Sequence, residues 1–454
     1  MTVRGESEAW QGFAVTLTPP TGRVQTRTMS AKTIDREILR LAVPTLAALV
    51  AEPLFLLVDT ALVGHLGGET LAGLGIASVV LQTAVGVLVF LAYATTPAVA
   101  RLLGAGDEPG ALRAGIDGMW LALAVGAVLL VAGLTLGGPV VALFGTQPEV
   151  ATSATTYLLI SVWGLPAMLL VLAGTGLLRG LQNTRTPLVI VGFGFAANAA
   201  LNAIFIYGFG WGIAGSALGT VIAQWGMALW FVAAIVRRSR GISLRPRLAG
   251  VSLVAASGGW LLLRTLWLRA AMLATVFVGS LLGITELASL QVALAVFSLI
   301  AFVLDALAIA GQAMVGHSLG VGDRHRVHAV ATRLVRFGLL AGVAIGLVVA
   351  ALSPFLGSVF TSDEQVRAAL PVVLLLMALG TPLAGFVFVL DGVLIGANDG
   401  RYLALTGLLN VAMYAPLLWL ALSSGSLVAL WAAFGFGYIG ARALTLGIRW
   451  RVLF

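Results

Sequence analysis

The chain has 454 residues, of which 60% are hydrophobic and 10% are charged. Soluble domains contain about 25% charged residues, so a chain of this composition cannot cover its apolar surface with polar groups in water. We therefore interpret it as an all-α integral membrane protein. The formal net charge is +8. Because the arginines lie in short segments between apolar runs, they indicate membrane topology rather than nucleic-acid binding.

Missing residue types exclude several kinds of site. The chain contains no cysteine, which excludes disulfides, thiolate metal sites and a cysteine nucleophile. Lys32 is the only lysine and follows Ala31, so the sequence has no P-loop for ATP. His325 and His328 lie in an arginine-rich segment without carboxylate partners. We expect no metal site, no cofactor and no enzymatic activity.

Residues 1–31 lack the apolar stretch of a cleavable signal peptide, and we predict a disordered cytoplasmic tail over 1–35. Twelve apolar runs follow, each close to or above the roughly 20 residues that a membrane span requires. They lie at 38–63, 70–97, 115–137, 154–176, 187–208, 212–236, 252–281, 287–314, 331–353, 367–392, 402–422 and 426–447.

Basic residues alternate between the connections of these runs. Five precede the first run, none lies in the GHLGGET segment after it, and five arginines lie in the 237–247 connection. Arg367 is the one basic residue on the predicted outer side of the second half. The positive-inside rule therefore predicts twelve spans in the cell inner (plasma) membrane, with both termini cytoplasmic.

The two halves of the chain are copies of one six-helix unit. A single offset of 216 residues relates Gly104, Gly106 and Asp107 to Gly320, Gly322 and Asp323, Gly164 and Pro166 to Gly380 and Pro382, and Gly180 to Gly396. Because six is even, both copies have the same orientation, which predicts a parallel repeat with a cavity between the halves. We expect an N-lobe at 36–238, a basic cytoplasmic linker at 239–251 and a C-lobe at 252–454. Two such bundles around a central path indicate a transporter.

The first span carries two carboxylates and two prolines. Glu52 and Asp59 are seven residues apart, two turns along one helix face. Ionisable residues inside a span indicate function, and burial favours the neutral form of an unpaired carboxyl group, so each can carry a proton. Pro44 and Pro53 permit a kink, and we predict a hinge there. Alternatively, Asp59 lies near the outer end of the span and is only solvated.

Other polar residues lie within the predicted spans. Asn198 and Asn202 are one turn apart in the fifth span, where buried amides can orient a carboxylate or hold helices together. We predict both as members of the coupling site.

The second half has Arg264 and Arg269 in its first span, Asp305 in the next and Asp391 in the tenth. Charges at this depth are expected to pair. Arg264 is expected to pair with Asp305 or Asp391, either in a salt bridge that opens during transport or in a permanent one.

Several stretches carry a resemblance to the multidrug and toxic compound extrusion (MATE) family, specifically its DinF-like branch. They are LAVPTLAALVAEPLFLLVDTALVGHLG at 41–67, GTGLLRGLQNTRTPL at 174–188, NAALNAIFIYGFGWGIAGSALGT at 198–220, LDALAIAGQAMVGHSLGVGD at 304–323 and LDGVLIGANDGRYLA at 390–404. The resemblance covers all twelve spans. It implies a V-shaped pair of bundles that exports organic compounds in exchange for H⁺ or Na⁺.

The resemblance also implies roles for residues of the N-lobe. Pro44 and Asp59 match the proline and aspartate that this family links to bending and cation coupling. Asn198 matches an asparagine of the family's N-lobe site. Asn202 stands where some archaeal members have a second aspartate, a departure from a two-aspartate site.

In the C-lobe, Asp391 matches an aspartate of NorM-like members. Their glutamate of the seventh span is missing, and this chain has Arg264 in that span instead. The difference disfavours a NorM-type Na⁺ site and favours proton coupling through Asp59.

From residues and resemblance together, we predict a secondary antiporter that exports organic compounds in exchange for H⁺. Cationic, amphiphilic substrates are favoured by the acidic side chains, although Arg264 and Arg269 equally suit anions. Alternatives are a Na⁺-coupled exporter of the same family, a lipid-head-group flippase of related fold, a major-facilitator transporter and a non-transporting scaffold. The expected partners are a small organic substrate, the coupling ion and membrane lipids, with no nucleic acid, and the expected state is a monomer.

Overall fold

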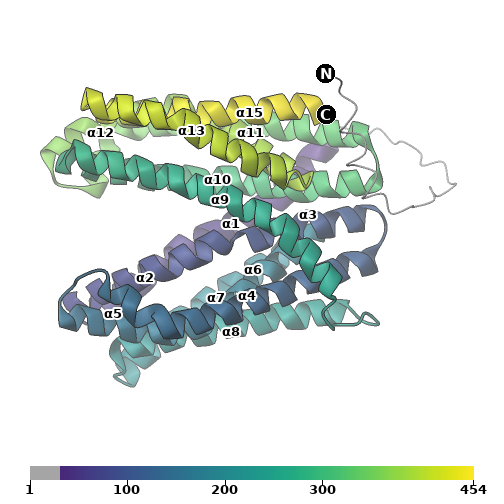
Figure 1. The fold of residues 1–454 in the computed structure, drawn as a ribbon, viewed down its shortest axis with the longest axis horizontal. Helices are drawn as coiled ribbons and strands as arrows, with labels where there is room; N and C mark the ends of the chain where they lie inside the picture. The colour runs from purple at the N-terminus through teal and green to yellow at the C-terminus, as the bar shows by residue number, and fades with distance from the viewer. Residues whose placement is uncertain (1–30, 454) are drawn as a thin grey trace.

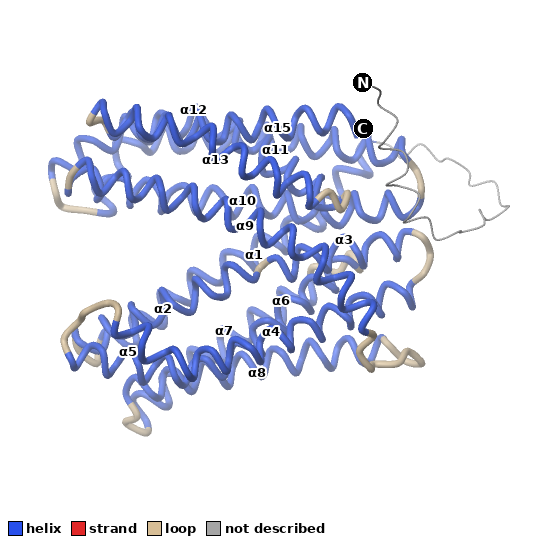
Figure 2. Tube along the Cα trace, viewed as in Figure 1, coloured by secondary structure: helices blue, strands red, loops and turns tan. Residues whose placement is uncertain are grey.

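The computed structural model describes residues 31–453, apart from the side chain of Glu52 (Figure 1). Within these residues the chain is helical with short connections and contains no strand (Figure 2). Twelve of the described helical segments are long and apolar enough to cross a membrane. The predicted number of spans is thus confirmed.

The N-lobe contains the first six spans. They are α1 (Ala31–Gly64), α2 (Gly68–Leu88) with α3 (Phe90–Gly104), α4 (Glu108–Ala142), α5 (Pro148–Ser161) with α6 (Leu165–Gly180), α7 (Arg185–Ala203) with a π-helical turn at Ile204–Gly208, and α8 (Gly212–Arg238).

The C-lobe contains the other six. They are α9 (Leu248–Leu282), α10 (Ile284–Val321), α11 (Arg324–Phe360), α12 (Glu364–Gly396), α13 (Gly400–Ser424), and α14 (Leu427–Ala432) with a π-helical segment at Ala433–Tyr438 and α15 (Ile439–Leu453).

Two predicted boundaries differ from the structure. The first helix begins at Ala31, so residues 31–35 are helical rather than part of a disordered tail; the remainder of that prediction, 1–30, lies outside the described residues. Asp35 accepts hydrogen bonds from Arg333 of α11 at 2.5 and 2.6 Å, which holds this first turn in place. The predicted linker is shorter at its end, because α9 begins at Leu248.

The two lobes form a V. Figure 1 shows them converging at the end where α3 leads into α4 and α8 into α9, and diverging toward the other end. At the converging end α3 packs against α9 and α10, and α1 packs against α10. We call this the closed end. The V-shaped pair of bundles predicted from the family resemblance is confirmed.

The repeated Gly-x-Gly-Asp motif has a structural cause in each lobe. Gly106 and Gly322 have φ angles of 81° and 78°, in the left-handed region that glycine tolerates at a helix end. Asp107 then caps the start of α4 by accepting from Gly110 N at 2.8 Å, and Asp323 caps α11 by accepting from Arg326 N at 2.9 Å.

The first glycine of the same motif lies where the two lobes cross. A methyl group at Gly104 would overlap the backbone carbonyl of His317, and one at Gly320 would overlap that of Arg101. Positions 101 and 317 are themselves related by the 216-residue offset. The closed end is therefore a symmetric contact between equivalent parts of α3 and α10, as expected for a parallel repeat.

This contact yields a first prediction. Gly320→Ala should destabilise the structure by about 1–3 kcal/mol, because the added methyl group overpacks a backbone-to-backbone contact. Thermal unfolding of the detergent-purified protein measures the effect as a lower Tm. Gly75→Ala is the matched control, since a methyl group there meets nothing within 4 Å. An unchanged Tm in Gly320→Ala would contradict the close approach.

The connection between the lobes is attached to α4. Asp117 is 0% exposed and accepts from the backbone N of Arg247 at 3.2 Å and from its Nη2 at 2.8 Å. Arg113 and Trp120 donate to backbone carbonyls of the same connection at 2.7 and 2.8 Å. Asp117 is therefore part of the closed end.

Candidate functional site

The Asp59 side chain lies inside the N-lobe. It comes from α1, is 5% exposed, and accepts hydrogen bonds from Asn202 Nδ2 at 2.7 Å and Ser216 Oγ at 2.9 Å. The solvated alternative for Asp59 is therefore wrong in this structure. We call Asp59 and the polar side chains around it the Asp59 cluster.

The asparagines of α7 connect this carboxylate to α8. Asn202 Nδ2 also donates to Asn198 Oδ1 at 3.0 Å, and Asn198 Nδ2 donates to Thr220 Oγ1 at 2.9 Å. The four-residue spacing places both amides on one helix face, as predicted. Tyr157 of α5 also contacts the carboxylate of Asp59.

All the groups that contact Asp59 in the described part of the chain are neutral. No described lysine, arginine or histidine forms an ion pair with it, so only N–H and O–H donors contact its carboxyl group. Asn202 Oδ1 is buried and has no hydrogen-bond partner among the described residues. The cluster thus holds a buried carboxylate together with an unused acceptor beside it.

Three members of the cluster were not predicted from the sequence. Ser216, Thr220 and Tyr157 lie in otherwise apolar helices, where single hydroxyl groups commonly bond to their own backbone. The sequence pattern that could have indicated two of them is the four-residue spacing of Ser216 and Thr220, which equals the spacing of Asn198 and Asn202.

The remaining N-lobe predictions have different outcomes. Pro44 and Pro53 both lie inside α1, which is helical through both positions, and their hinge role stays a prediction. Glu52 lies in α1, but its side chain is outside the described part of the structure. Its role therefore also stays a prediction.

A charged cluster occupies the C-lobe face of the space between the lobes. Asp391 of α12 accepts hydrogen bonds from Arg264 of α9, including one from Nε at 3.3 Å, and from Arg442 of α15. Of the two predicted partners for Arg264, the structure selects Asp391. Asp305 of α10 forms no ion pair with a described residue, although both arginines lie within electrostatic reach.

These charges line a cavity of about 190 Å³. Residues of α2 and α3 form one wall, and residues of α9, α10, α12 and α15 form the rest. Arg442 lies in the last predicted span and was not among the residues predicted from the sequence to pair with an aspartate.

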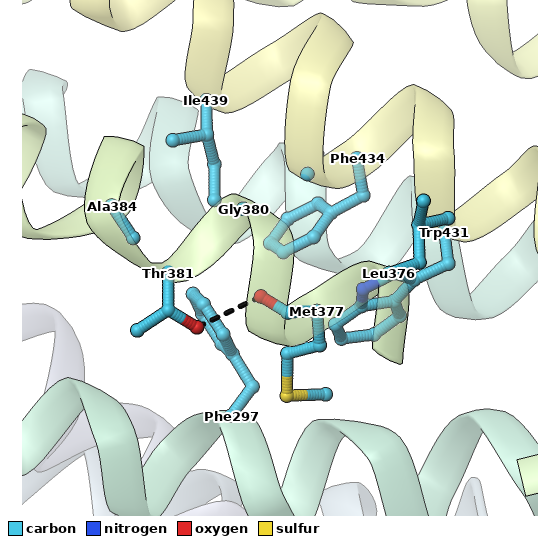
Figure 3. Close-up of a pocket in the computed structure, with 10 residues that line it drawn as sticks. Phe297, Leu376, Met377, Gly380, Thr381, Ala384, Trp431, Phe434 and Ile439 are labelled. Atoms are coloured by element: carbon cyan, nitrogen blue, oxygen red, sulfur yellow. Dashed lines mark hydrogen bonds between the residues drawn. The ribbon is translucent and has the colours of Figure 1, made fainter. Parts of the chain in front are cut away.

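A second, smaller pocket lies inside the C-lobe between α12 and the π-helical segment. Figure 3 shows Phe297, Met377 and Phe434 around it, with Thr381 donating to Met377 O at 2.8 Å. Its volume of about 10 Å³ is at the lower limit for one water molecule. It is too small for an organic substrate.

The two lobes differ at equivalent positions. The offset of 216 places Thr275 and Tyr414 where the N-lobe has Asp59 and Asn198, and their hydroxyl groups are 2.8 Å apart. The C-lobe copy of the Asp59 cluster is therefore neutral. Within the described residues, no group of three or more His, Asp or Glu side chains could hold a metal ion.

Comparisons with known proteins agree with this architecture. The MatE family model matches residues 44–204 and 265–420. The chain is 30% identical over 445 residues to a probable multidrug resistance protein NorM of Bradyrhizobium diazoefficiens, covering 91% of this chain and 92% of that protein.

It is also 26% identical over 424 residues to the DNA damage-inducible protein F of Escherichia coli, covering 92% of each. The crystal structure of the Vibrio cholerae MATE transporter VcmN in the bent form superposes with a TM-score of 0.86 at 21% identity. That match covers 93% of this chain and 98% of the other.

Proposed function

The chain belongs to the MatE family, so it is a multi-pass membrane transporter rather than an enzyme, and from this premise we propose that it exports organic compounds in exchange for protons. Asp59 is the proton-carrying group in this proposal. The observation that carries it is the burial of the Asp59 carboxylate among neutral donors, in a helix that packs against both lobes.

The surroundings of Asp59 favour a proton over Na⁺. A bound metal cation requires oxygen lone pairs directed toward it. Around Asp59, the Asn202 amide and the Ser216 hydroxyl instead direct hydrogen atoms at the carboxylate. A proton binds the carboxylate without needing further ligands, which also suits the absence of a second acidic side chain at position 202.

Protonation changes what Asp59 can bond to. A neutral carboxylic acid acquires an O–H donor, and Asn202 Oδ1 is an unused acceptor in the same cluster. A rotation of this amide would exchange its Nδ2 donor for its Oδ1 acceptor. The contact of α1 with α7 and α8 then changes, and Pro44 and Pro53, which remove backbone donors, allow α1 to bend.

The membrane supplies the driving force for this change. Each elementary charge that moves down a potential of about 100 mV releases about 2.3 kcal/mol, and a pH gradient adds to it. In the proposed orientation, the arginine-rich closed end faces the cytoplasm of a cell whose plasma membrane holds the protein. The structure then corresponds to a state open toward the outside.

Return to the inward-facing state requires the closed end to separate. Arg333→Gln should favour that separation modestly, because the lost ion pair with Asp35 is partly exposed. Since the chain lacks cysteine, Ser318→Cys provides a single label site at a buried position of the closed end. Thiol labelling should be faster with Arg333→Gln than without it.

The matched control is Arg336→Gln, one helical turn further along α11, where the side chain is exposed. This substitution should leave the labelling rate unchanged. Equal labelling in all three proteins would show that the Asp35–Arg333 contact does not stabilise the closed end.

Gradient-driven efflux tests the proposed function. Proteoliposomes are loaded with ethidium or with phenyl phosphate, and either a pH gradient or a Na⁺ gradient is imposed. We expect the pH gradient to drive efflux of at least one probe and the Na⁺ gradient to drive neither. Efflux driven by Na⁺ alone would support the Na⁺-coupled alternative, and the absence of efflux under both gradients would contradict export.

A further inference from the structure

The cavity between the lobes holds more positive than negative side chains. Three arginines line it, Arg264, Arg269 and Arg442, together with two aspartates, Asp305 and Asp391. Asp391 is shared by Arg264 and Arg442, so a single carboxylate forms the ion pairs of two guanidinium groups. Each guanidinium has five N–H donors, and one carboxylate cannot accept from all of them.

Arg269 adds a charge without a counter-ion. It is exposed and forms no ion pair with a described residue. Its guanidinium reaches from α9 to α2 of the other lobe, where a methyl group at Gly86 would lie 2.6 Å from Arg269 Nη2. A ligand that contacts Arg269 therefore lies between the two lobes.

The cavity also has an unsatisfied neutral group. Gln312 of α10 lines it and is 2% exposed, and its Oε1 has no hydrogen-bond partner among the described residues. Buried polar atoms are normally paired, so this amide oxygen is available to accept a hydrogen bond from an O–H or N–H group of a ligand beside the arginines.

The arginines that line the cavity come from the C-lobe only. Positions 48, 53 and 226, which the 216-residue offset relates to Arg264, Arg269 and Arg442, are Ala48, Pro53 and Gly226. The N-lobe has the proton-accepting carboxylate, and the C-lobe has the arginines. The two copies therefore differ in which charged residues they carry.

We infer that the arginines of the C-lobe bind the anionic group of the exported compound, so that the substrate is an organic anion with a carboxylate or phosphate group. This inference rests on the proposed function for the direction of transport. Guanidinium groups suit carboxylate and phosphate because they donate two parallel hydrogen bonds. The anionic group of the ligand takes the place of Asp391 as partner of one arginine and binds Arg269 at the same time.

Two probes of similar size and opposite charge test the inference. Binding of phenyl phosphate and of phenyltrimethylammonium to the purified full chain is followed by calorimetry at neutral pH. We expect the anion to bind and the cation not to bind. Arg269→Gln should weaken binding of the anion by about tenfold or more, since a charge-assisted pair is lost, and Arg336→Gln should not change it.

The outcomes separate this inference from the proposed function. Binding of the anion without proton-driven efflux would leave the inference standing and contradict the proposed function. Proton-driven efflux without binding of the anion, or equal binding by wild type and Arg269→Gln, would overturn the inference.

Lipid phosphate and free phosphate share the same chemistry. Vesicles that contain fluorescently labelled phosphatidylglycerol distinguish them, because a lipid substrate would change leaflets in an Arg269-dependent way. Such movement would assign the anionic group to a lipid headgroup, whereas binding of phenyl phosphate without lipid movement would assign it to a soluble compound. Neither result would contradict an anion site.

Discussion

Asp59→Asn is expected to reduce proton-driven efflux to the level of protein-free vesicles. Asparagine is close in size and polarity to aspartate but cannot bind and release a proton near neutral pH. It can still make neutral hydrogen bonds with Asn202 and Ser216, the groups that surround Asp59. The protein should therefore fold and insert normally while its coupling to the pH gradient is lost.

Controls distinguish lost coupling from lost folding. Glu69→Gln removes an exposed carboxylate at the start of α2 and should keep wild-type efflux. Asp59→Glu keeps an ionisable group and should retain part of the activity. Full proton-driven efflux by Asp59→Asn would move the coupling group elsewhere, with Asp305 and Asp391 as the next candidates.

The largest expected loss of stability follows from Asp391→Asn. This substitution leaves Arg264 and Arg442 without a carboxylate partner in a buried position. Breaking a buried ion pair by removing one partner costs about 3–5 kcal/mol, since the remaining charge is uncompensated. Thermal unfolding in detergent should show a correspondingly lower Tm and a lower yield of monodisperse protein.

Two comparisons test the cause of that loss. Asp305→Asn, which breaks no ion pair, should change the Tm much less. Phenyl phosphate should restore part of the Tm of Asp391→Asn, because an anion supplies the missing charge and a ligand that binds the native state stabilises it. A stable Asp391→Asn protein would show that the arginines do not need this carboxylate.

Much of the fold could be predicted because the sequence patterns that indicate it extend over many residues. Twelve apolar runs and the alternation of arginines each extend over the whole sequence, and lipid leaves helices as the natural way to satisfy their backbone groups. The 216-residue repeat predicted two equivalent bundles, and Gly104 and Gly320 lie at the contact between them. The start of α1 was misplaced, and the contact of Asp35 with Arg333 of the distant helix α11 could not be seen in the sequence.

The site could be predicted only in part, because its partners come from distant helices. Asp59, Asn198 and Asn202 were identifiable as polar residues in apolar spans, and the structure brings them together. Which aspartate pairs with Arg264 depends on the approach of α9 and α12, and the sequence left this open. Ser216 and Arg442 became visible only when α8 and α15 were placed beside the groups they contact.

Infrared difference spectroscopy tests the central role of Asp59 most directly. Spectra of the reconstituted wild type and Asp59→Asn are recorded on acidification across the pH range in which transport occurs. Proton binding to Asp59 predicts a protonated-carboxyl band, sensitive to deuterium exchange, that is present in the wild type and absent from Asp59→Asn. Identical carboxyl bands in the two proteins would contradict proton coupling through Asp59.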